Sequence, residues 1–522
     1  MTEYVVAVDV GTASARAGVF DAAGTLLGRD QRDLALARPE AGRGEYDSED
    51  IWACVCASVR SALAEVGARP EEVRGISFDA TCSLVLRQPD GSQLPLREAD
   101  GRSFDTIAWF DHRAVAEAEE CTATGHEVLD YVGGVMSPEM EVPKLMWLKR
   151  HRPEIWESLG AAYDLCDFLT WRATGENDRS VCALACKWTY LGHTGAPWRM
   201  DFFDQVGLSD VLERTALPDI ATDVGMSIAT LTREAAGELG LSTDCMVVCG
   251  LIDAHAGTIG TIGAMDPDIF DRHLALIAGT STCVMALARR ARSIPGVWGP
   301  YKDAVLPGLW LNEGGQSATG ALLDYTLERH GLGLDDHHRI TKLAEAELAA
   351  DPDFAARLHV VPDHHGNRSP LADPHALGVV SGLTMDTSDT ALAALYYKTA
   401  LGIAYGVRHI VHEMNRAGYE INTLHVAGGH TKNPLLMRLY ADATQCDVVF
   451  AAAEDGVLLG TAVVAAGGCG MHPDIFAAAQ AMVPEGRTQA FRPAEAQRHQ
   501  RGYERFRLMQ DHRAELDAMD KK

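Results

Sequence analysis

The sequence predicts an α/β protein built from two related lobes. Short runs of β-branched and aliphatic residues alternate along the chain with longer helix-like segments, which is the pattern of α/β domains. In addition, a unit made of a strand, a small Gly-Thr turn and a second strand occurs at Gly11-Thr12 and again at Gly279-Thr280. This recurrence indicates an internally duplicated architecture.

The first unit predicts a β-hairpin followed by a third extended piece. Tyr4–Val8 and Ala15–Phe20 form its strands, Asp9–Thr12 forms the turn, and a further strand begins at Thr25–Gly28. Glycine with short polar residues between β-branched runs is typical of such a turn.

The alternation continues through the rest of the first half. The expected elements are a helix over Ser48–Ala64 with Ser48 as its N-cap, a buried strand Val73–Phe78, helical pieces at Lys144–Arg150 and Asp164–Arg172, a helix Thr232–Leu239, a strand Met246–Cys249, and a helix that starts at Ala254–Gly257.

The second half repeats the alternation. Its expected elements are the strands Leu274–Ala278 and Cys283–Leu287, a long helix Thr390–Arg416, a strand Thr423–Ala427, a helix Asn433–Thr444 with Pro434 in its first turn, and a charged surface helix with a frayed end over Pro493–Lys522.

Length and charge restrict the classes of partner. The 522 residues suggest two or three domains, and 46 Lys+Arg against 73 Asp+Glu give a formal charge of −27. This charge argues against nucleic acid or an anionic membrane surface as a partner, because binding them requires Lys and Arg to neutralise phosphates. A small phosphorylated ligand stays possible, since backbone N–H groups and a metal ion can hold phosphate.

Targeting signals and cysteine usage point to the cytoplasm. The N-terminus MTEYVVAVDV lacks a basic region and a long apolar run, and no segment reaches about 18 apolar residues. The 12 cysteines include no CxxC pair, which favours buried free thiols over disulfides or a zinc site.

Two acidic sites are candidates for chemistry. In the turn Asp9–Arg16 a carboxylate precedes Gly-Thr, so it can orient Mg²⁺ while backbone N–H groups face phosphate, although plain hairpins also use such turns. Asp253 follows a strand and Gly250, where it is either a helix N-cap or a general base for an attacking hydroxyl. We interpret His255 as structural.

Two glycine turns are candidates for nucleotide contact. Gly279–Thr282 can place N–H and hydroxyl donors around phosphates, and Gly428–Pro434 lets a nucleotide approach the backbone at a helix N-terminus. Neither turn is specific by itself, because most glycines that follow strands only make turns.

Several other site classes lack their motifs. The sequence contains no GxxxxGK[ST], no GxGxxG after a first strand and no HExxH, and Ser281 has no GxSxG context. His364-His365 suggests a metal site, but a polar loop is the favoured interpretation.

Taken in order, the DVGT turn, GLIDAHAG, AGTST and AGGHTKNP resemble the FGGY carbohydrate kinases, from about Val5 to about Ala466. This resemblance implies two actin-like (ribonuclease H-like) ATPase lobes with a central cleft. The chain is most similar to the D-ribulokinase branch in the stretches FDATCSLV, WFDHRA, YVGGVMSPEMEVPKL, CKWTY, PGVWGPY, WLNEGGQSATG and GNRSPLADP. L-ribulokinases are the closest alternative, whereas glycerol kinases carry Arg-Glu and xylulokinases Met-His or a similar pair where Ala80-Thr81 stand here.

The resemblance assigns roles to individual residues. Asp253 matches the catalytic base and, with Asp9, the magnesium site. The residues that match the ATP site are Gly11, Thr12, Arg16, Gly279, Thr280, Gly428, Gly429 and Asn433. Ala13 departs from the pattern, since relatives more often have glycine or a polar residue there.

The same comparison implies the sugar site and the activity. The residues that match it are Ala80, Thr81, Asp111, Lys187, Asp253 and Glu313, with Asp111 as a support of the pocket. The expected lobes are 1–262 and 263–490, followed by a C-terminal helix, 491–522. The expected reaction is ATP-dependent phosphorylation of D-ribulose to D-ribulose 5-phosphate.

Alternatives to that reaction remain. L-ribulose, xylulose or ribitol are alternative substrates, and a non-catalytic sugar sensor, an actin-like scaffold or a metal-dependent hydrolase are remoter alternatives. The resemblance also implies a possible homodimer.

Overall fold

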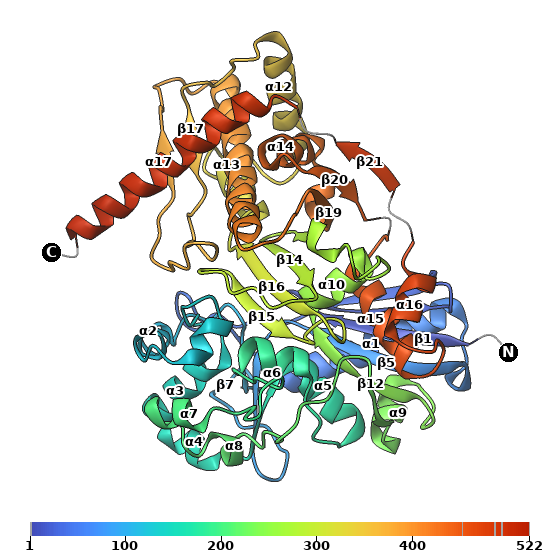
Figure 1. Ribbon diagram of the computed structural model, residues 1–522. Helices are drawn as coiled ribbons and strands as arrows, with labels where there is room; N and C mark the ends of the chain where they lie inside the picture. The colour runs from blue at the N-terminus through green and yellow to red at the C-terminus, as the bar shows by residue number, and fades with distance from the viewer. Residues whose placement is uncertain (1–2, 452, 485–486, 492–493, 521–522) are drawn as a thin grey trace.

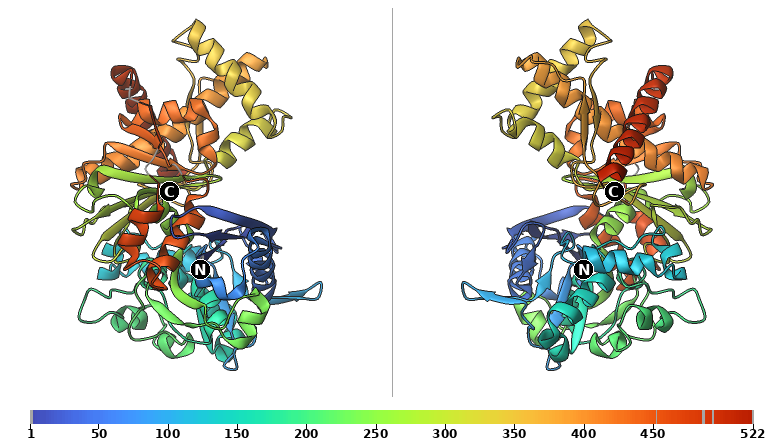
Figure 2. Two further views of the ribbon diagram at one scale, coloured as in Figure 1. Left: turned by 90° about the vertical axis from the view of Figure 1, so that its right-hand side faces the viewer. Right: turned by 90° about the vertical axis from the view of Figure 1, so that its left-hand side faces the viewer.

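The computed structural model describes residues 3–451, 453–484, 487–491 and 494–520. Within them the chain forms two lobes, each built around a central sheet (Figures 1 and 2). The first two residues of the chain, Pro493 and the last two residues of the expected C-terminal helix lie outside this part. No helix in the described part of the chain is long and apolar enough to span a membrane.

The first lobe contains a mixed sheet. Its strands are, in spatial order, β11 (Ser227–Thr230), β12 (Met246–Ile252), β5 (Val73–Ala80), β1 (Tyr4–Val10), β2 (Ser14–Phe20) and β3 (Leu26–Asp33). The strands β12, β5 and β1 run parallel, whereas β1, β2 and β3 form the predicted antiparallel meander. The parallel register brings the ends of β1 and β5 together, with Asp9 opposite Asp79.

Helices cover both faces of this sheet. Along β1, Val6 and Val8 pack toward α1 (Ser48–Val66), α5 (Leu165–Thr174) and α9 (Arg233–Leu239), whereas Val5 and Ala7 pack toward α10 (Asp253–Ile262), α15 (Gly456–Gly468) and α16 (Ile475–Met482). Successive side chains of a strand point to opposite faces, so a strand covered on both faces is apolar throughout, as this one is.

Smaller elements complete the first lobe. They are β4 (Glu45–Tyr46), β6 (Leu84–Arg87), β7 (Arg97–Ala99), β8 (Arg102–Phe104), β9 (Thr106–Ile107), β10 (Ala161–Asp164), α2 (Val115–Ala123), α3 (Glu141–His151), α4 (Pro153–Ser158), α6 (Val181–Lys187), α7 (Met200–Gln205) and α8 (Val211–Arg214).

The second lobe repeats the plan. Its sheet has the order β15 (Trp298–Lys302), β16 (Trp310–Gln316), β14 (Thr282–Ala288), β13 (His273–Ala278), β19 (Thr423–Ala427), β20 (Asp447–Phe450) and β21 (Arg487–Phe491). The outer elements are α11 (Gly320–Glu328), α12 (Asp336–Ala350), β17 (His359–Val361), β18 (Val379–Ser381), α13 (Asp389–Arg416), α14 (Pro434–Thr444) and α17 (Ala496–Asp520). As β1 does in the first lobe, β13 pairs with its hairpin partner on one side and with a parallel strand on the other. The predicted duplication is therefore present in the fold.

Two helices pack against each other between the sheets (Figure 1). The helix α10 follows β12 and packs on β13 of the second lobe, while α15 follows β20 and packs on β1, β5 and β12 of the first. Glycines permit their close approach: a Cβ at Gly460 would lie 1.8 Å from the Ala256 carbonyl oxygen, and one at Gly260 would lie 1.9 Å from that of Gly456. Although α15 and α16 come late in the sequence, they pack on the first lobe.

The local predictions agree with the structure apart from end positions. Asp47, and not Ser48, is the N-cap of α1, because the Asp47 side chain accepts hydrogen bonds from the N–H groups of Glu49 and Asp50. Ser48 is instead fully buried and donates to Asp105. Two capping residues stand side by side in the sequence, and the tertiary contact with Asp105 selects between them.

Candidate active site between the lobes

Three carboxylates meet at the ends of the parallel strands of the first lobe. Asp9 is fully buried near the end of β1, Asp79 is its partner on β5, and Asp253 is the first residue of α10, directly after β12. Burial raises the pKa of all three, to about 7 for Asp9, and the neighbouring carboxylates add to the effect for Asp9 and Asp79. Asp253 is not a side-chain N-cap, since Ile252 occupies the cap position.

The predicted magnesium site is tested by the polar atoms around it. Asp9 Oδ1 and Asp79 Oδ1 are buried and find no hydrogen-bond donor among the described residues. Buried carboxylate oxygens without donors suit a hard cation, and Mg²⁺ is commonly held by one or two carboxylates together with substrate phosphates. In the described part of the chain no group of three or more His, Cys, Asp or Glu side chains is arranged to hold a metal ion.

Arg16 connects these carboxylates to the second candidate region. It lies opposite Asp9 in the β1–β2 hairpin and forms an ion pair with it, and its second nitrogen lies 3.2 Å from Asp455. Asp455 is the N-cap of α15 and also pairs with Arg29 at 3.1 Å. The β1–β2 hairpin therefore contacts the N-terminus of α15 through Arg16.

A cavity of about 730 Å³ opens beside this contact. The predicted nucleotide residues Arg16, Gly279, Gly428 and Gly429 line it, together with Gly257 of α10. Gly428 has φ of +92° and a Cβ there would lie 2.5 Å from the Ala278 carbonyl oxygen, so only glycine fits this turn. The sequence analysis missed Lys432, Asp455 and Gly456, which also line the cavity.

The other predicted nucleotide residues, Gly11, Thr12, Thr280 and Asn433, are not among the residues that line this cavity. Thr280 is in the β13–β14 turn, where its carbonyl accepts from the Thr319 N–H. Asn433 is the N-cap of α14, because its side-chain oxygen accepts a hydrogen bond from the Leu436 N–H. Its side-chain amide nitrogen donates to the Tyr396 hydroxyl at 3.2 Å. Gly11 and Thr12 form the first turn, and the Thr12 hydroxyl accepts from Trp109 at 2.9 Å.

The predicted sugar residues Lys187 and Glu313 form a buried charged cluster with His255. Lys187 ends α6, Glu313 lies on β16, and both are 3% exposed. His255 on α10 lies 3.3 Å from Glu313 and 2.9 Å from the Cys182 sulfur. Burial opposes charge on the cluster, but the Lys187 ammonium and its neighbours lower the pKa of Glu313 to about 2. His255 therefore links Glu313 to α10, and its structural role stays a prediction.

Arg368, Glu139 and Trp298 complete this cluster and were not singled out from the sequence. Arg368 lies 3.1 Å from Glu313 and 3.5 Å from Glu139, and its guanidinium carbon is 4.2 Å from the Trp298 ring centre. Lys187 lies 4.3 Å from the same ring. Arg368 and Glu139 belong to the stretches GNRSPLADP and YVGGVMSPEMEVPKL, which carry the family resemblance. A charged residue within such a stretch was the sequence feature from which both could have been predicted.

The remaining predicted sugar residues, Ala80, Thr81 and Asp111, are also buried. Ala80 and Thr81 are buried at the end of β5, and the Thr81 N–H donates to the Val10 carbonyl. Asp111 is fully buried and accepts from Arg113 through both carboxylate oxygens, as well as from the Gly44 N–H at 2.8 Å. Its oxygens are engaged within the chain, which suits a supporting role.

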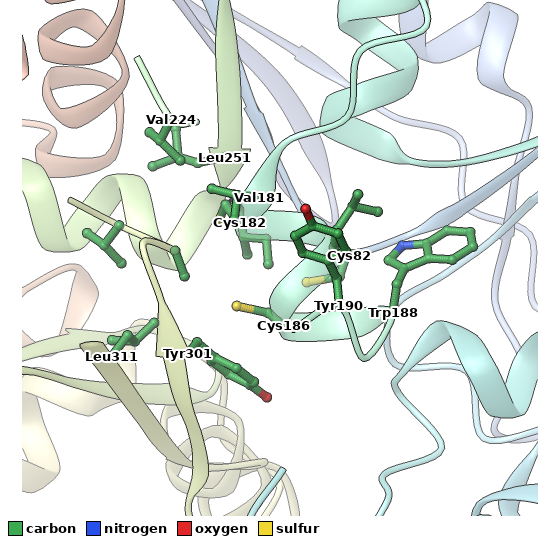
Figure 3. Packing of buried hydrophobic residues seen from close by; sticks show 14 of the residues in the cluster. Cys82, Val181, Cys182, Cys186, Trp188, Tyr190, Val224, Leu251, Tyr301 and Leu311 are labelled. Carbon is green, nitrogen blue, oxygen red and sulfur yellow. Dashed lines mark hydrogen bonds between the residues drawn. The ribbon is translucent and has the colours of Figure 1, made fainter. Parts of the chain in front are cut away.

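Buried thiols surround the same region. Figure 3 shows Cys82, Cys182 and Cys186 with Tyr301 in one hydrophobic cluster around α6. Burial raises the pKa of each of these thiols, so at neutral pH they are uncharged packing groups.

Comparisons with known proteins identify relatives of this chain. The family profiles described as "FGGY family of carbohydrate kinases", N-terminal and C-terminal domains, match residues 4–260 and 274–469. The chain is 40% identical to the FGGY carbohydrate kinase domain-containing protein of Xenopus laevis, over 99% of this chain and 98% of that protein. It is 36% identical to a D-ribulokinase of Saccharomyces cerevisiae, over 89% and 72%. A xylulose kinase structure from Rhodospirillum rubrum superposes with a TM-score of 0.81 at 21% identity, covering 100% of both chains.

Proposed function

Since the chain belongs to the FGGY family of carbohydrate kinases, we propose that it transfers the γ-phosphoryl group of ATP to a hydroxyl group of a pentulose, D-ribulose first among the candidates. One observation carries the proposal. The helix α10 begins with Asp253, contacts Glu313 through His255 and lines the nucleotide cavity with Gly257. A single rigid element thus connects the candidate base with both substrate regions.

Asp253 is the candidate general base in this scheme. Burial raises its pKa, so the ionised carboxylate accepts a proton more readily than an exposed aspartate does. It would take the proton of the sugar hydroxyl as the hydroxyl oxygen attacks the γ-phosphorus. Phosphoryl transfer needs alignment and charge stabilisation more than covalent chemistry, and this arrangement of residues provides both.

The other residues bind and orient. Lys187 and Glu313 would hold sugar hydroxyls as a donor and an acceptor, with Arg368 fixing the Glu313 carboxylate. Arg16 and the glycine turns Gly279 and Gly428-Gly429 would hold the phosphates and the nucleoside. Asp9 and Asp253 would hold Mg²⁺, which when bound neutralises phosphate charge.

The substrate assignment rests on similarity and on the type of pocket. A chain that is 36% identical and named D-ribulokinase supports D-ribulose over L-ribulose, xylulose or ribitol. A pocket built from paired charged groups discriminates between hydroxyl patterns, because a missing hydroxyl leaves a buried polar group without a partner. Because ATP is its co-substrate, we place the enzyme in the cytoplasm.

A substrate panel tests the proposal. We expect sugar-dependent ADP release to have its highest kcat/KM with D-ribulose among D-ribulose, L-ribulose, D-xylulose, ribitol and glycerol. A preference for L-ribulose or D-xylulose would refute the assignment of D-ribulose as the substrate, but it would still support the proposed kinase activity.

The variant Asp253→Asn tests the base. We expect its kcat to fall by about 10²–10⁴-fold with the sugar still bound, since the positioned proton acceptor is lost. Near wild-type turnover in this variant would show that Asp253 is not the base. Sugar binding without turnover in the wild-type protein would instead indicate a sensor.

A further inference from the structure

A second cavity lies in the outer part of the second lobe, away from the interlobe cleft. It has a volume of about 370 Å³ and is enclosed by α13, α17 and the segment around β17. In Figure 1 the helix α17 runs across α13 in this region. The two helices approach closely, since a Cβ at Gly502 would lie 2.0 Å from the Tyr405 hydroxyl. The two helical walls are therefore firmly packed, and the turn residues Asp353, Ala356 and Arg357 complete the lining.

Cationic side chains dominate this cavity, although the whole chain carries a formal charge of −27. The cations that line it are Arg357, Lys398, Arg498, Arg501 and Arg505. Among the described residues that line it, Asp353 is the single carboxylate. Such a concentration of one sign of charge on a strongly acidic protein attracts anions to that point.

Lys398 is the central feature of the cavity. It lies on α13, is only 9% exposed, and makes no ion pair or hydrogen bond with any described residue. Its ammonium nitrogen is 5.1 Å from the Tyr397 ring centre. Burial, with Arg498 and Arg505 nearby, lowers its pKa to about 8. A buried ammonium group without a counter-charge is costly in free energy, and a bound anion would remove that cost.

Three of the four arginines around Lys398 are also available. Arg357, Arg501 and Arg505 form no ion pair within the described residues, whereas Arg498 pairs with the exposed Glu495 at 3.0 Å and donates to the Pro352 carbonyl oxygen. Guanidinium groups bind phosphate oxygens through two parallel hydrogen bonds, and a lysine adds a point charge. The two histidines of the wall, His359 and His499, have lowered pKa values because of burial and the neighbouring cations, which reflects the same positive field.

We propose that the cavity between α13, β17 and α17 is a second anion site that binds a small phosphorylated molecule, with Lys398 at its base and Arg505 and Arg501 at its mouth. The site is separate from the sugar and nucleotide regions and does not depend on the proposed function. The volume of about 370 Å³ admits a pyrophosphate or a sugar phosphate and is too small for a macromolecule.

Calorimetric titration of the full chain tests the site, with inorganic pyrophosphate and D-ribose 5-phosphate as probes at low ionic strength without Mg²⁺. We expect at least one probe to bind, and the stronger of the two identifies inorganic polyphosphate or a phosphate ester as the ligand class. In Lys398→Met and in Arg505→Ala this binding should weaken by about tenfold or more, since charge-assisted hydrogen bonds are lost. The matched control is Lys432→Met, which removes a lysine from the nucleotide cavity and should leave this binding unchanged.

Hydrogen exchange provides a second readout. The bound probe should slow amide exchange in α17 and in β17 of the wild-type protein, and not in Lys398→Met. Because Arg505 is exposed on α17, its replacement keeps the fold even if Lys398→Met does not. The proposal is overturned if neither probe binds, if binding is equal in wild type, Lys398→Met and Arg505→Ala, or if Lys432→Met alone abolishes it.

Discussion

Buried charged side chains in the cleft are held by partners from other elements. Glu313 on β16 contacts His255 on α10 and Arg368 from the segment before β18, and Arg368 in turn contacts Glu139 of the first lobe. Burying any one of these charged side chains alone would cost desolvation free energy, and the opposite charges of its neighbours offset that cost. The orientation of Glu313 toward a sugar is therefore a property of this network.

The first prediction concerns Arg368. In Arg368→Met the carboxylates of Glu313 and Glu139 lose their shared buried cation, so the free energy of unfolding should fall by about 3–5 kcal/mol. The KM for the sugar should rise more than the KM for ATP. Denaturant unfolding and steady-state kinetics measure the two effects.

Arg339→Met is the matched control for that substitution. Arg339 lies on α12 and pairs with the exposed carboxylates Asp336 and Asp389. Exposed pairs contribute little to stability, so this variant should behave as the wild type does. If the free energy of unfolding fell equally in the two variants, the buried contacts of Arg368 would contribute no more to stability than the exposed pairs of Arg339 do.

A second prediction concerns pH. Burial raises the pKa of Asp253 above its ordinary value of 3.8, whereas Lys187 and its neighbours lower that of Glu313 to about 2. As the pH falls, Asp253 is protonated before Glu313, and a protonated carboxyl cannot act as a base. The acid limb that Asp253 causes should therefore appear in kcat, at a pH above the ordinary pKa of an aspartate, while the KM for the sugar stays constant. An acid limb in KM alone would contradict this assignment.

At the scale of elements, the crossing of α10 and α15 decides the geometry of the site. One helix begins with Asp253 and the other follows the N-cap Asp455, which binds Arg16. Thr461 of α15 also donates to Asp79. The distance between the base and the nucleotide region thus depends on how closely these two helices pack.

The third prediction is a matched pair of Gly→Ala substitutions in helices. In Gly460→Ala the new methyl group would lie 1.8 Å from the Ala256 carbonyl oxygen, so the helices must separate, which should cost about 1–3 kcal/mol of stability and lower kcat. In Gly237→Ala on the exposed side of α9 nothing lies within 4 Å, and helix propensity alone should stabilise the protein slightly. Thermal unfolding compares the two, and a stabilised Gly460→Ala would refute the close packing.

At the scale of the whole molecule, both substrate regions combine residues from the two lobes. Lys187 and Glu313 face each other across the lobes at the sugar region, and Arg16 and Gly428 both line the nucleotide cavity. We expect a ligand in either region to contact both lobes and to restrict their relative motion. Its presence would then reduce the entropy cost of binding the other ligand.

The fourth prediction is this coupling. Isothermal titration should show the sugar binding about fivefold or more tightly when a non-hydrolysable ATP analogue and Mg²⁺ are present, and the analogue should gain the same factor from the sugar. Equal sugar affinities with and without the analogue would show that the lobes do not couple the two sites.

Local sequence patterns predict the order of strands and helices, the duplicated hairpins, the family and the motif residues. These features depend on local periodicity and on turns such as Gly428, where one residue type fits. Contacts between distant segments have no local signature. Hence Asp79, Arg368 and Glu139 were recognised as site residues only after folding placed them beside Asp9 and Glu313.

The tertiary structure also decided which of two adjacent capping residues caps α1, and it placed α15 and α16 on the first lobe although they follow the second lobe in the sequence. It alone revealed the cationic cavity around Lys398, whose members come from the turn before β17, from α13 and from α17. The physical reason is the same in each case. Burial and charge compensation are properties of the folded neighbourhood of a side chain, and that neighbourhood is assembled from distant parts of the sequence.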